Sequence, residues 1–300
     1  MPRANKNKEA AVGSQNRTVS PNEAKSALTH CIQLQRPIMM WGAPGIGKSD
    51  IVKQIADAEG REVIDIRLPL WEPTDIKGIP YYNSKENNMV WASPAELPTD
   101  PKSNAIVFLD ELNSAAPAVQ AAAYQLILNR RVGQYHLPKG VSIVAAGNRD
   151  SDKGVTYRMP APLANRFVHI ELRVDFEDWM QWATNQHIHA DVVGYCTFAK
   201  QDLYDFDPRG SSRSFATPRS WSFVSQLLSD DLPESTLTDL VAGCVGEGLA
   251  VKFMNHRKIS GQLPNPSDIL SGKVKDLKSK EISAMYSLTV SLCYELQQAH

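Results

Sequence analysis

The chain has 300 residues, 42% of them hydrophobic and 22% charged, with a formal net charge of −1. This length and composition favour about two globular domains and exclude disordered, collagenous and disulfide-rich classes. The charge balance provides no overall positive field to hold nucleic acid or an anionic membrane. The four cysteines form no CxxC pair, and no segment reads as a signal peptide or a membrane-spanning helix. We therefore expect a soluble, cytoplasmic protein without membrane association.

The first predicted element is a helix that follows a basic, polar tail at residues 1–19. Ser20, Pro21 and Glu23 supply a capping hydroxyl, a proline at the first helical position and a reciprocal carboxylate. The tail has too few large apolar side chains to order itself. We expect disorder up to residue 19 and a helix from there to about residue 33.

Short apolar runs then alternate with helical patterns. The runs lie at 37–41, 104–110 and 141–148, and the helical patterns between them at 49–59 and 116–131. Runs that are apolar on both faces are typical of buried strands in a parallel sheet. Strand alternating with helix predicts an α/β domain with a doubly wound parallel sheet, which we place at 20–206.

The character of the sequence changes after Phe206. A polar stretch rich in Gly, Ser and Pro is followed only by helical patterns, the last of them at 281–298. We therefore predict a smaller, all-helical C-terminal domain over residues 207–300.

One loop carries the strongest chemical signal. It matches the pattern GxxxxGK[ST] and consists of Gly42, Ala43, Pro44, Gly45, Ile46, Gly47, Lys48 and Ser49. The glycines allow the loop to aim backbone N–H groups at a phosphate, and the following helix adds its positive dipole. Lys48 would lie against the β- and γ-phosphates and the Ser49 hydroxyl would ligate Mg²⁺. The loop predicts a P-loop that binds ATP with Mg²⁺.

The second signal is a pair of adjacent carboxylates after the apolar run at 104–110. Asp110 would hold the Mg²⁺ shell, and Glu111 would polarise an attacking water molecule. A transferase must keep water away from the γ-phosphate, so a glutamate beside it favours hydrolysis.

Three further side chains complete a candidate hydrolytic site. Asn148 ends the third strand, where it could contact the γ-phosphate or the water, although such residues also serve as turn formers. Arg166 is separated from the P-loop by enough chain to reach a neighbouring subunit's ATP, or it is a surface arginine in an ion pair. Arg219 follows the predicted cap Thr217 in the first turn of a helix, where a cation requires a nearby anion.

With these residues in this order, the chain resembles the AAA+ ATPases, and most closely the MoxR branch, over about residues 20–255. The resemblance implies Walker A at 42–49, Walker B at Asp110 and Glu111, sensor one at Asn148, the arginine finger at Arg166 and sensor two at Arg219. It further implies a hexameric ring and a helical lid. MoxR proteins commonly remodel or chaperone a protein partner with a von Willebrand A domain.

Two segments carry additional features of that branch. Residues 71–82 match an insert in the second helix and 131–141 a hairpin before sensor one, both of which face the pore or the partner in such rings. Asn165 departs from the pattern, because many relatives carry Asp there.

Two functions from different classes are consistent with these residues. The favoured hypothesis is an ATP-hydrolysing ring that remodels a protein partner. The alternative is a nucleic-acid-dependent ATPase similar to a clamp loader or helicase. The absence of an excess of basic residues disfavours this alternative. The alternative is favoured by the basic tail and by Arg130, Arg131 and Lys139.

Overall fold

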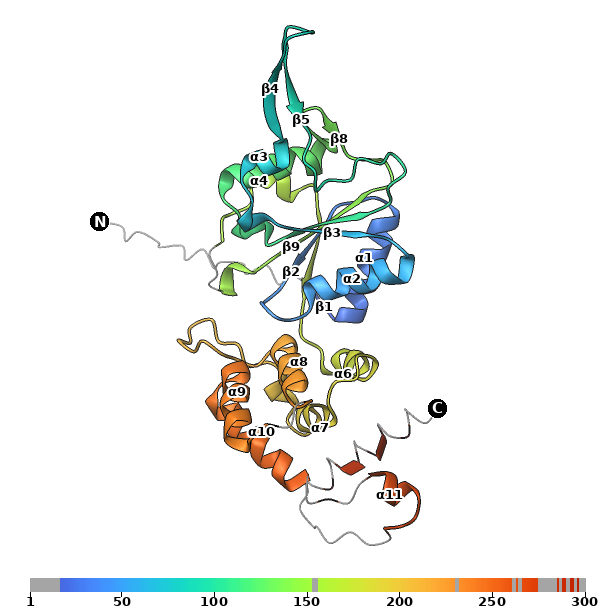
Figure 1. Ribbon diagram of the computed structural model, residues 1–300, viewed down its shortest axis with the longest axis vertical. Coiled ribbons are helices and arrows are strands. Elements are labelled where there is room, and N and C mark those ends of the chain that lie inside the picture. Colours follow the sequence, from blue (N-terminus) through green and yellow to red (C-terminus); the bar gives the residue numbers. More distant parts are fainter. Residues whose placement is uncertain are drawn as a thin grey trace, which may run out of the picture.

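The computed structural model describes residues 17–152, 156–229, 232–260, 263 and 266–274, with isolated positions from 285 to 296. Figure 1 shows an α/β part and a helical part, which follow one another along the long axis of the molecule. Most of the tail and of the helix predicted at 281–298 lies outside the described residues. No helix in the described ranges is both long and apolar enough to span a bilayer.

A six-stranded sheet forms the centre of the α/β part, and all its neighbouring strands are parallel. The strands, in spatial order, are β1 (Thr18–Val19), β10 (Val168–Leu172), β2 (Ile38–Trp41), β9 (Ser142–Gly147), β6 (Ile106–Asp110) and β3 (Val63–Arg67). The three apolar runs of the sequence are therefore the adjacent central strands β2, β9 and β6. The pairing also places Thr18 and Val19, at the end of the predicted tail, on the sheet edge.

Both faces of this sheet are covered, because alternate residues of the central strands β2, β9 and β6 enter different hydrophobic clusters. On β2, Ile38 and Met40 pack with the helices α1 (Pro21–Gln33) and α2 (Lys48–Glu59), while Met39 packs with α4 (Pro117–Asn129). Figure 1 shows α1 and α2 on one side of the sheet and α4 on the other. This arrangement confirms the predicted α/β fold with a parallel sheet, and the predicted capping box of Ser20 and Glu23 begins α1.

Two hairpins and several short helices extend from the α/β part. The short helices are α3 (Pro73–Lys77), α5 (Ala161–Ala164), η1 (Leu68–Leu70), η2 (Leu112–Ser114) and η3 (Asp150–Asp152). The hairpins are β4 (Ile79–Asn83) with β5 (Asn88–Ala92), and β7 (Arg131–Val132) with β8 (Tyr135–His136). The first hairpin projects away from the sheet (Figure 1) and exposes Ile79, Tyr81, Tyr82 and Met89.

The helical part is built around a hydrophobic cluster of its own. Its helices are α6 (Phe176–Asn185), α7 (Ala190–Phe198), η4 (Lys200–Leu203), α8 (Pro218–Leu227), α9 (Glu234–Val245), α10 (Glu247–Ser260) and α11 (Pro266–Leu270). Trp179 of α6 and Val192 of α7 share this cluster with Trp221 of α8 and Phe253 of α10. Packing therefore begins the helical part at α6, upstream of the boundary predicted at residue 207.

Candidate nucleotide site

The loop 42–49 connects β2 to α2 at the carboxyl end of the sheet. Gly45 and Gly47 have φ angles of 74° and 92°, a left-handed region in which a side chain would be strained. Lys48 and Ser49 are the first residues of α2, so the positive end of that helix points at the loop. These are the backbone features that a phosphate-binding loop requires.

The Lys48 ammonium group is buried, with only 8% of the residue exposed. Its Nζ donates to the carbonyl oxygens of Gly42 at 2.6 Å and Ala43 at 2.9 Å, and to Asn148 Oδ1 at 3.2 Å. Burial lowers the pKa of Lys48 to about 8, although the nearby Asp110 carboxylate acts in the opposite direction. Within the described part of the chain, no carboxylate forms an ion pair with this buried cation, which is therefore well suited to receive an anionic ligand.

Walker B residues lie next to this loop. Strand β6 ends at Asp110, whose Oδ2 accepts a hydrogen bond from Ser49 Oγ at 3.4 Å. A hydroxyl and a carboxylate side by side are hard oxygen donors of the kind that Mg²⁺ prefers, so these two residues fit the predicted metal site. Glu111 follows in the left-handed conformation, with φ 54°, and its side chain is exposed. The carboxylates therefore have different environments, as separate metal-binding and water-activating roles require.

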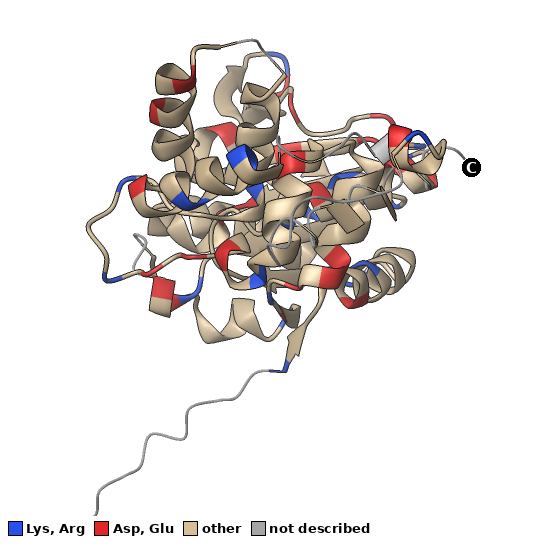
Figure 2. Cartoon of the chain, turned by 90° about the horizontal axis from the view of Figure 1, so that it is seen from below, with Lys and Arg blue, Asp and Glu red and all other residues tan. Residues whose placement is uncertain are grey.

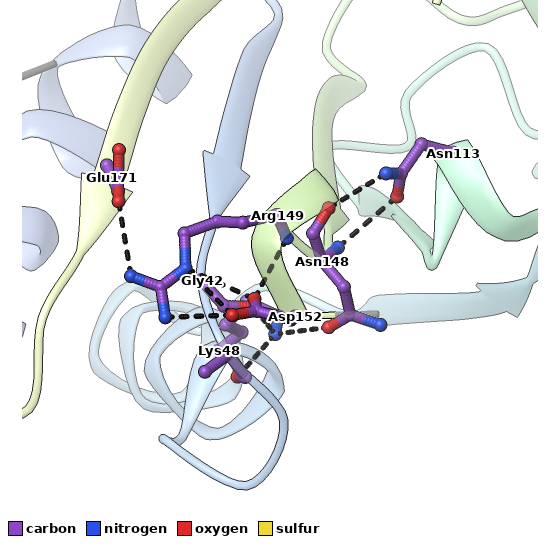
Figure 3. Close-up of polar contacts among 8 residues, drawn as sticks. Gly42, Lys48, Asn113, Asn148, Arg149, Asp152 and Glu171 are labelled. Atoms are coloured by element: carbon purple, nitrogen blue, oxygen red, sulfur yellow. Dashed lines mark hydrogen bonds and ion pairs between the residues drawn. The ribbon is translucent and has the colours of Figure 1, made fainter. Parts of the chain in front are cut away.

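Asn148 also joins the site, directly after β9. Its backbone is held by Asn113, a residue that the sequence analysis did not single out: Asn113 Nδ2 donates to Asn148 O at 2.8 Å and Oδ1 accepts from Asn148 N at 3.2 Å. Figure 3 shows the two side chains and the Lys48 contact. The only available signal was the position of Asn113 three residues after Asp110.

A second unpredicted group is centred on Arg149, the residue after Asn148. Its guanidinium contacts Asp152 at 3.0 Å and Glu171 of β10 at 3.3 Å (Figure 3). Its backbone N–H also donates to Asp152 Oδ2 at 3.0 Å. These contacts raise the pKa of Arg149 and fix the chain just after β9.

Arg219 meets the P-loop from the helical part. Thr217 caps α8 and Pro218 is its first residue, as predicted, and the Arg219 N–H donates to Gly45 O at 3.2 Å. A Cβ at Gly45 would come within 2.7 Å of Thr217 Oγ1. Helix α8 is therefore packed directly against the P-loop.

A cleft of about 810 Å³ lies between the two parts of the molecule at this point. Its lining includes Gly45, Ser49, Asp110, Glu111 and Arg219. Of the predicted site residues, the lining contains Gly45, Ile46, Gly47 and Ser49 of Walker A, both Walker B carboxylates and Arg219, whereas Lys48 and Asn148 are not part of it.

Arg166 lies elsewhere. It is exposed, and it precedes β10, whose amino end pairs with the amino end of β2. The P-loop leaves the opposite, carboxyl end of β2. The turn of Arg166 is fixed by His169, which accepts from Trp41 Nε1 at 2.9 Å and contacts Ala164 O at 2.7 Å. Arg166 does not reach the P-loop of its own chain.

The parallel sheet and the P-loop cleft together define a P-loop NTPase fold. Residues 37–167 match the sequence profile of the AAA domain of the dynein-related subfamily. This part of the chain is therefore similar to AAA domains in sequence and has the P-loop NTPase fold.

Relatives share this region at modest identity. The chain is 28% identical to Midasin of Giardia intestinalis over 186 residues, which are 59% of this chain and 4% of that protein. It is 31% identical to Midasin of Dictyostelium discoideum over 107 residues, 33% of this chain and 2% of that protein. The chain thus spans only a small fraction of these relatives. A solved structure of a Thermotoga maritima RuvB variant has 18% identity and a TM-score of 0.45, and covers 95% of this chain and 91% of its own.

Proposed function

We propose that this protein hydrolyses ATP with Mg²⁺ and works as a MoxR-type ring on a protein partner. The observation that carries the proposal is the buried Lys48 ammonium, which meets the Asn148 amide beside the Ser49 and Asp110 oxygens. Such a cation in a loop of positive φ angles has the chemistry to receive a triphosphate.

The roles divide among the residues of the P-loop, the residues that follow β6 and β9, and Arg219 of α8. Backbone N–H groups of the P-loop and Lys48 bind the phosphates, while Ser49 and Asp110 hold Mg²⁺, which neutralises developing charge. Glu111, exposed beside them, accepts a proton from water. Arg219 contributes a second cation from α8, and Asn148 donates to the γ-phosphate or to the water.

The proposed assembly is a homo-oligomeric, hexameric ring in which α6–α10 form the lid. Its support is Arg166, an exposed residue before the amino end of β10 and remote from its own P-loop. The proposed partner is a protein with a von Willebrand A domain. The resemblance to the MoxR branch motivates that choice, and the exposed side chains of Ile79, Tyr81, Tyr82 and Met89 on β4 and β5 provide apolar surface for a contact.

The nucleic-acid alternative is disfavoured by charge. Lysines and arginines are intermixed with acidic residues along the described chain (Figure 2), and the whole chain has a net charge of −1. Hydrolysis that DNA stimulates with a steep salt dependence would support this alternative instead.

The test of ATP hydrolysis compares Lys48→Ala with Glu111→Gln. Lys48→Ala is expected to abolish nucleotide binding, because it removes the buried charge. Glu111→Gln should bind MgATP as the parent protein does and fail to hydrolyse it, since Asp110 and the loop are unchanged. Equilibrium binding and phosphate release distinguish these results, and equal loss of binding in both variants contradicts the assignment.

The same Glu111→Gln variant tests the partner. With ATP bound and not hydrolysed, it should retain its partner during affinity purification from the source cells, and mass spectrometry identifies the captured proteins. We expect a von Willebrand A domain among them, absent when Lys48→Ala is the bait. Captured proteins without that domain contradict the proposed partner but leave hydrolysis untouched.

A further inference from the structure

We infer that Asn113 is a positioning residue for hydrolysis, which acts by fixing the backbone of Asn148. The inference rests on the proposed ATPase function and assigns a role within the same site. Asn113 itself is not among the residues that line the cleft.

The geometry of the pair is that of a backbone bridge made by a side chain. The Asn113 carboxamide donates to the carbonyl and accepts from the N–H of the same residue, Asn148, at 2.8 and 3.2 Å. These two hydrogen bonds hold the peptide groups on both sides of the Asn148 Cα atom, and so fix the position and orientation of the Asn148 backbone. The backbone of Asn148 therefore cannot rotate freely, and this restricts the positions that its side chain can adopt.

Burial makes this bridge costly to break. Asn113 is only 1% exposed, so a missing partner would leave a buried polar group without a hydrogen bond. Its own carbonyl oxygen accepts from Tyr157 N at 2.6 Å. A Cβ on Gly147 would collide with Asn113 Oδ1, so the side chain fits against the end of β9 without spare room.

The bridge connects the two strands that carry the chemistry. Asn113 lies in η2, just after Asp110 and Glu111, and Asn148 lies just after β9. Asn148 Oδ1 accepts from Lys48 Nζ, which leaves its N–H₂ group as the donor for a phosphate oxygen or water. Asn113 thus sets the distance between the water-activating carboxylate and this donor.

The test uses Asn113→Asp, which keeps the shape and the acceptor but replaces the donor by a carboxylate oxygen that faces the Asn148 carbonyl. Asn113→Ala is the second variant, and Asn129→Asp, at the exposed end of α4, is the matched control. We expect kcat for ATP to fall about 10- to 100-fold in both Asn113 variants, because small misplacements of a catalytic group have effects of this size. The Kd for a non-hydrolysable ATP analogue should change by less than about threefold, since Lys48 retains its two carbonyl partners.

A double-mutant cycle with Asn148→Ala separates positioning from general stability. If Asn113 acts through the Asn148 side chain, Asn113→Ala should lower kcat by no more than about twofold once that side chain is absent. Full additivity of the two losses, or kcat equal to that of Asn129→Asp, would overturn the inference.

Hydrogen exchange provides a readout that does not depend on hydrolysis. The Asn148 amide should be protected in the parent protein and should exchange faster in Asn113→Ala, while amides in the centre of β9 stay protected. Unchanged protection at Asn148 would overturn the inference even if the parent protein hydrolyses no ATP, a result that would by itself refute only the proposed function.

Discussion

Replacing Arg166 by alanine is expected to abolish ATP hydrolysis and leave ATP binding almost unchanged. In the sheet, Val168 pairs with Ile38 and Glu171 with Trp41, the residue before the P-loop. Arg166 precedes Val168, so at about 3.3 Å per residue it lies about 15 to 20 Å from the start of the loop. An arginine side chain cannot span that distance, so this guanidinium can act only on the site of another subunit.

The magnitude follows from the chemistry of such a contact. An arginine supplied in trans to a γ-phosphate increases the rate by about 10³ to 10⁵, which corresponds to about 4 to 7 kcal/mol of the barrier. The loss should appear in kcat and not in the Kd for ATP. Arg209→Ala, an exposed arginine in the segment before α8, is the matched control and should retain full activity.

Mixing experiments test whether the site is shared. Lys48→Ala subunits bind no ATP but provide intact fingers, so adding them to Arg166→Ala subunits should restore partial activity. The specific activity of the parent protein should also rise with concentration as rings assemble. Absence of rescue, together with a concentration-independent rate from a monomer verified by light scattering, would refute the reasoning.

Two further predictions concern the P-loop cation and the projecting hairpin. Burial lowers the pKa of Lys48 to about 8. The affinity for fully ionised MgATP should therefore fall by about tenfold between pH 7 and 9, as the ammonium group loses its proton. A Kd that stays constant over this range would contradict the assignment of Lys48 as the phosphate-binding cation. Changing Tyr81→Ala together with Tyr82→Ala should leave basal hydrolysis within a few fold but remove stimulation by the protein partner, since the side chains are 52% and 65% exposed. A large fall in the melting temperature would instead show that these tyrosines stabilise the fold.

The sequence was sufficient for features that depend on chain neighbours. The glycines and lysine of the P-loop act through a local backbone path, and the two carboxylates follow directly on an apolar strand. The predicted strands were correct because residues buried on both faces leave continuous apolar runs. The helix caps predicted at Ser20 and Thr217 were also correct, because a helix cap depends on residues within four positions of one another.

Features that depend on residues far apart in the chain could not be predicted from the sequence. In the sequence, Asn113 follows the Walker B pair as any turn residue could. Its proposed role depends on its hydrogen bonds to Asn148, which is 35 positions away. Arg149 likewise pairs with Glu171 on another strand. The boundary at 207 followed a polar stretch, whereas Trp179 and Val192, upstream of it, pack into the helical cluster. Composition identifies a loop, but burial decides which elements share a core.

The contacts between the two parts of the molecule explain how a change at the phosphates can become a movement. Helix α8 contacts the P-loop through Thr217 and through the Arg219 N–H on Gly45. Elsewhere in the lining of the same cleft, Asn22 of α1 donates two hydrogen bonds to the Asp178 carboxylate of α6. Its backbone N–H donates to Asp178 Oδ2 and its side-chain Nδ2 to Asp178 Oδ1, both at 2.8 Å. We therefore expect a ligand that displaces the P-loop, or draws Arg219 toward an anion, to act on α8 through these contacts. Since α6 and α8 share one hydrophobic cluster, we expect the helical part to move as a body, and the proposed hydrolysis of ATP to reverse that movement.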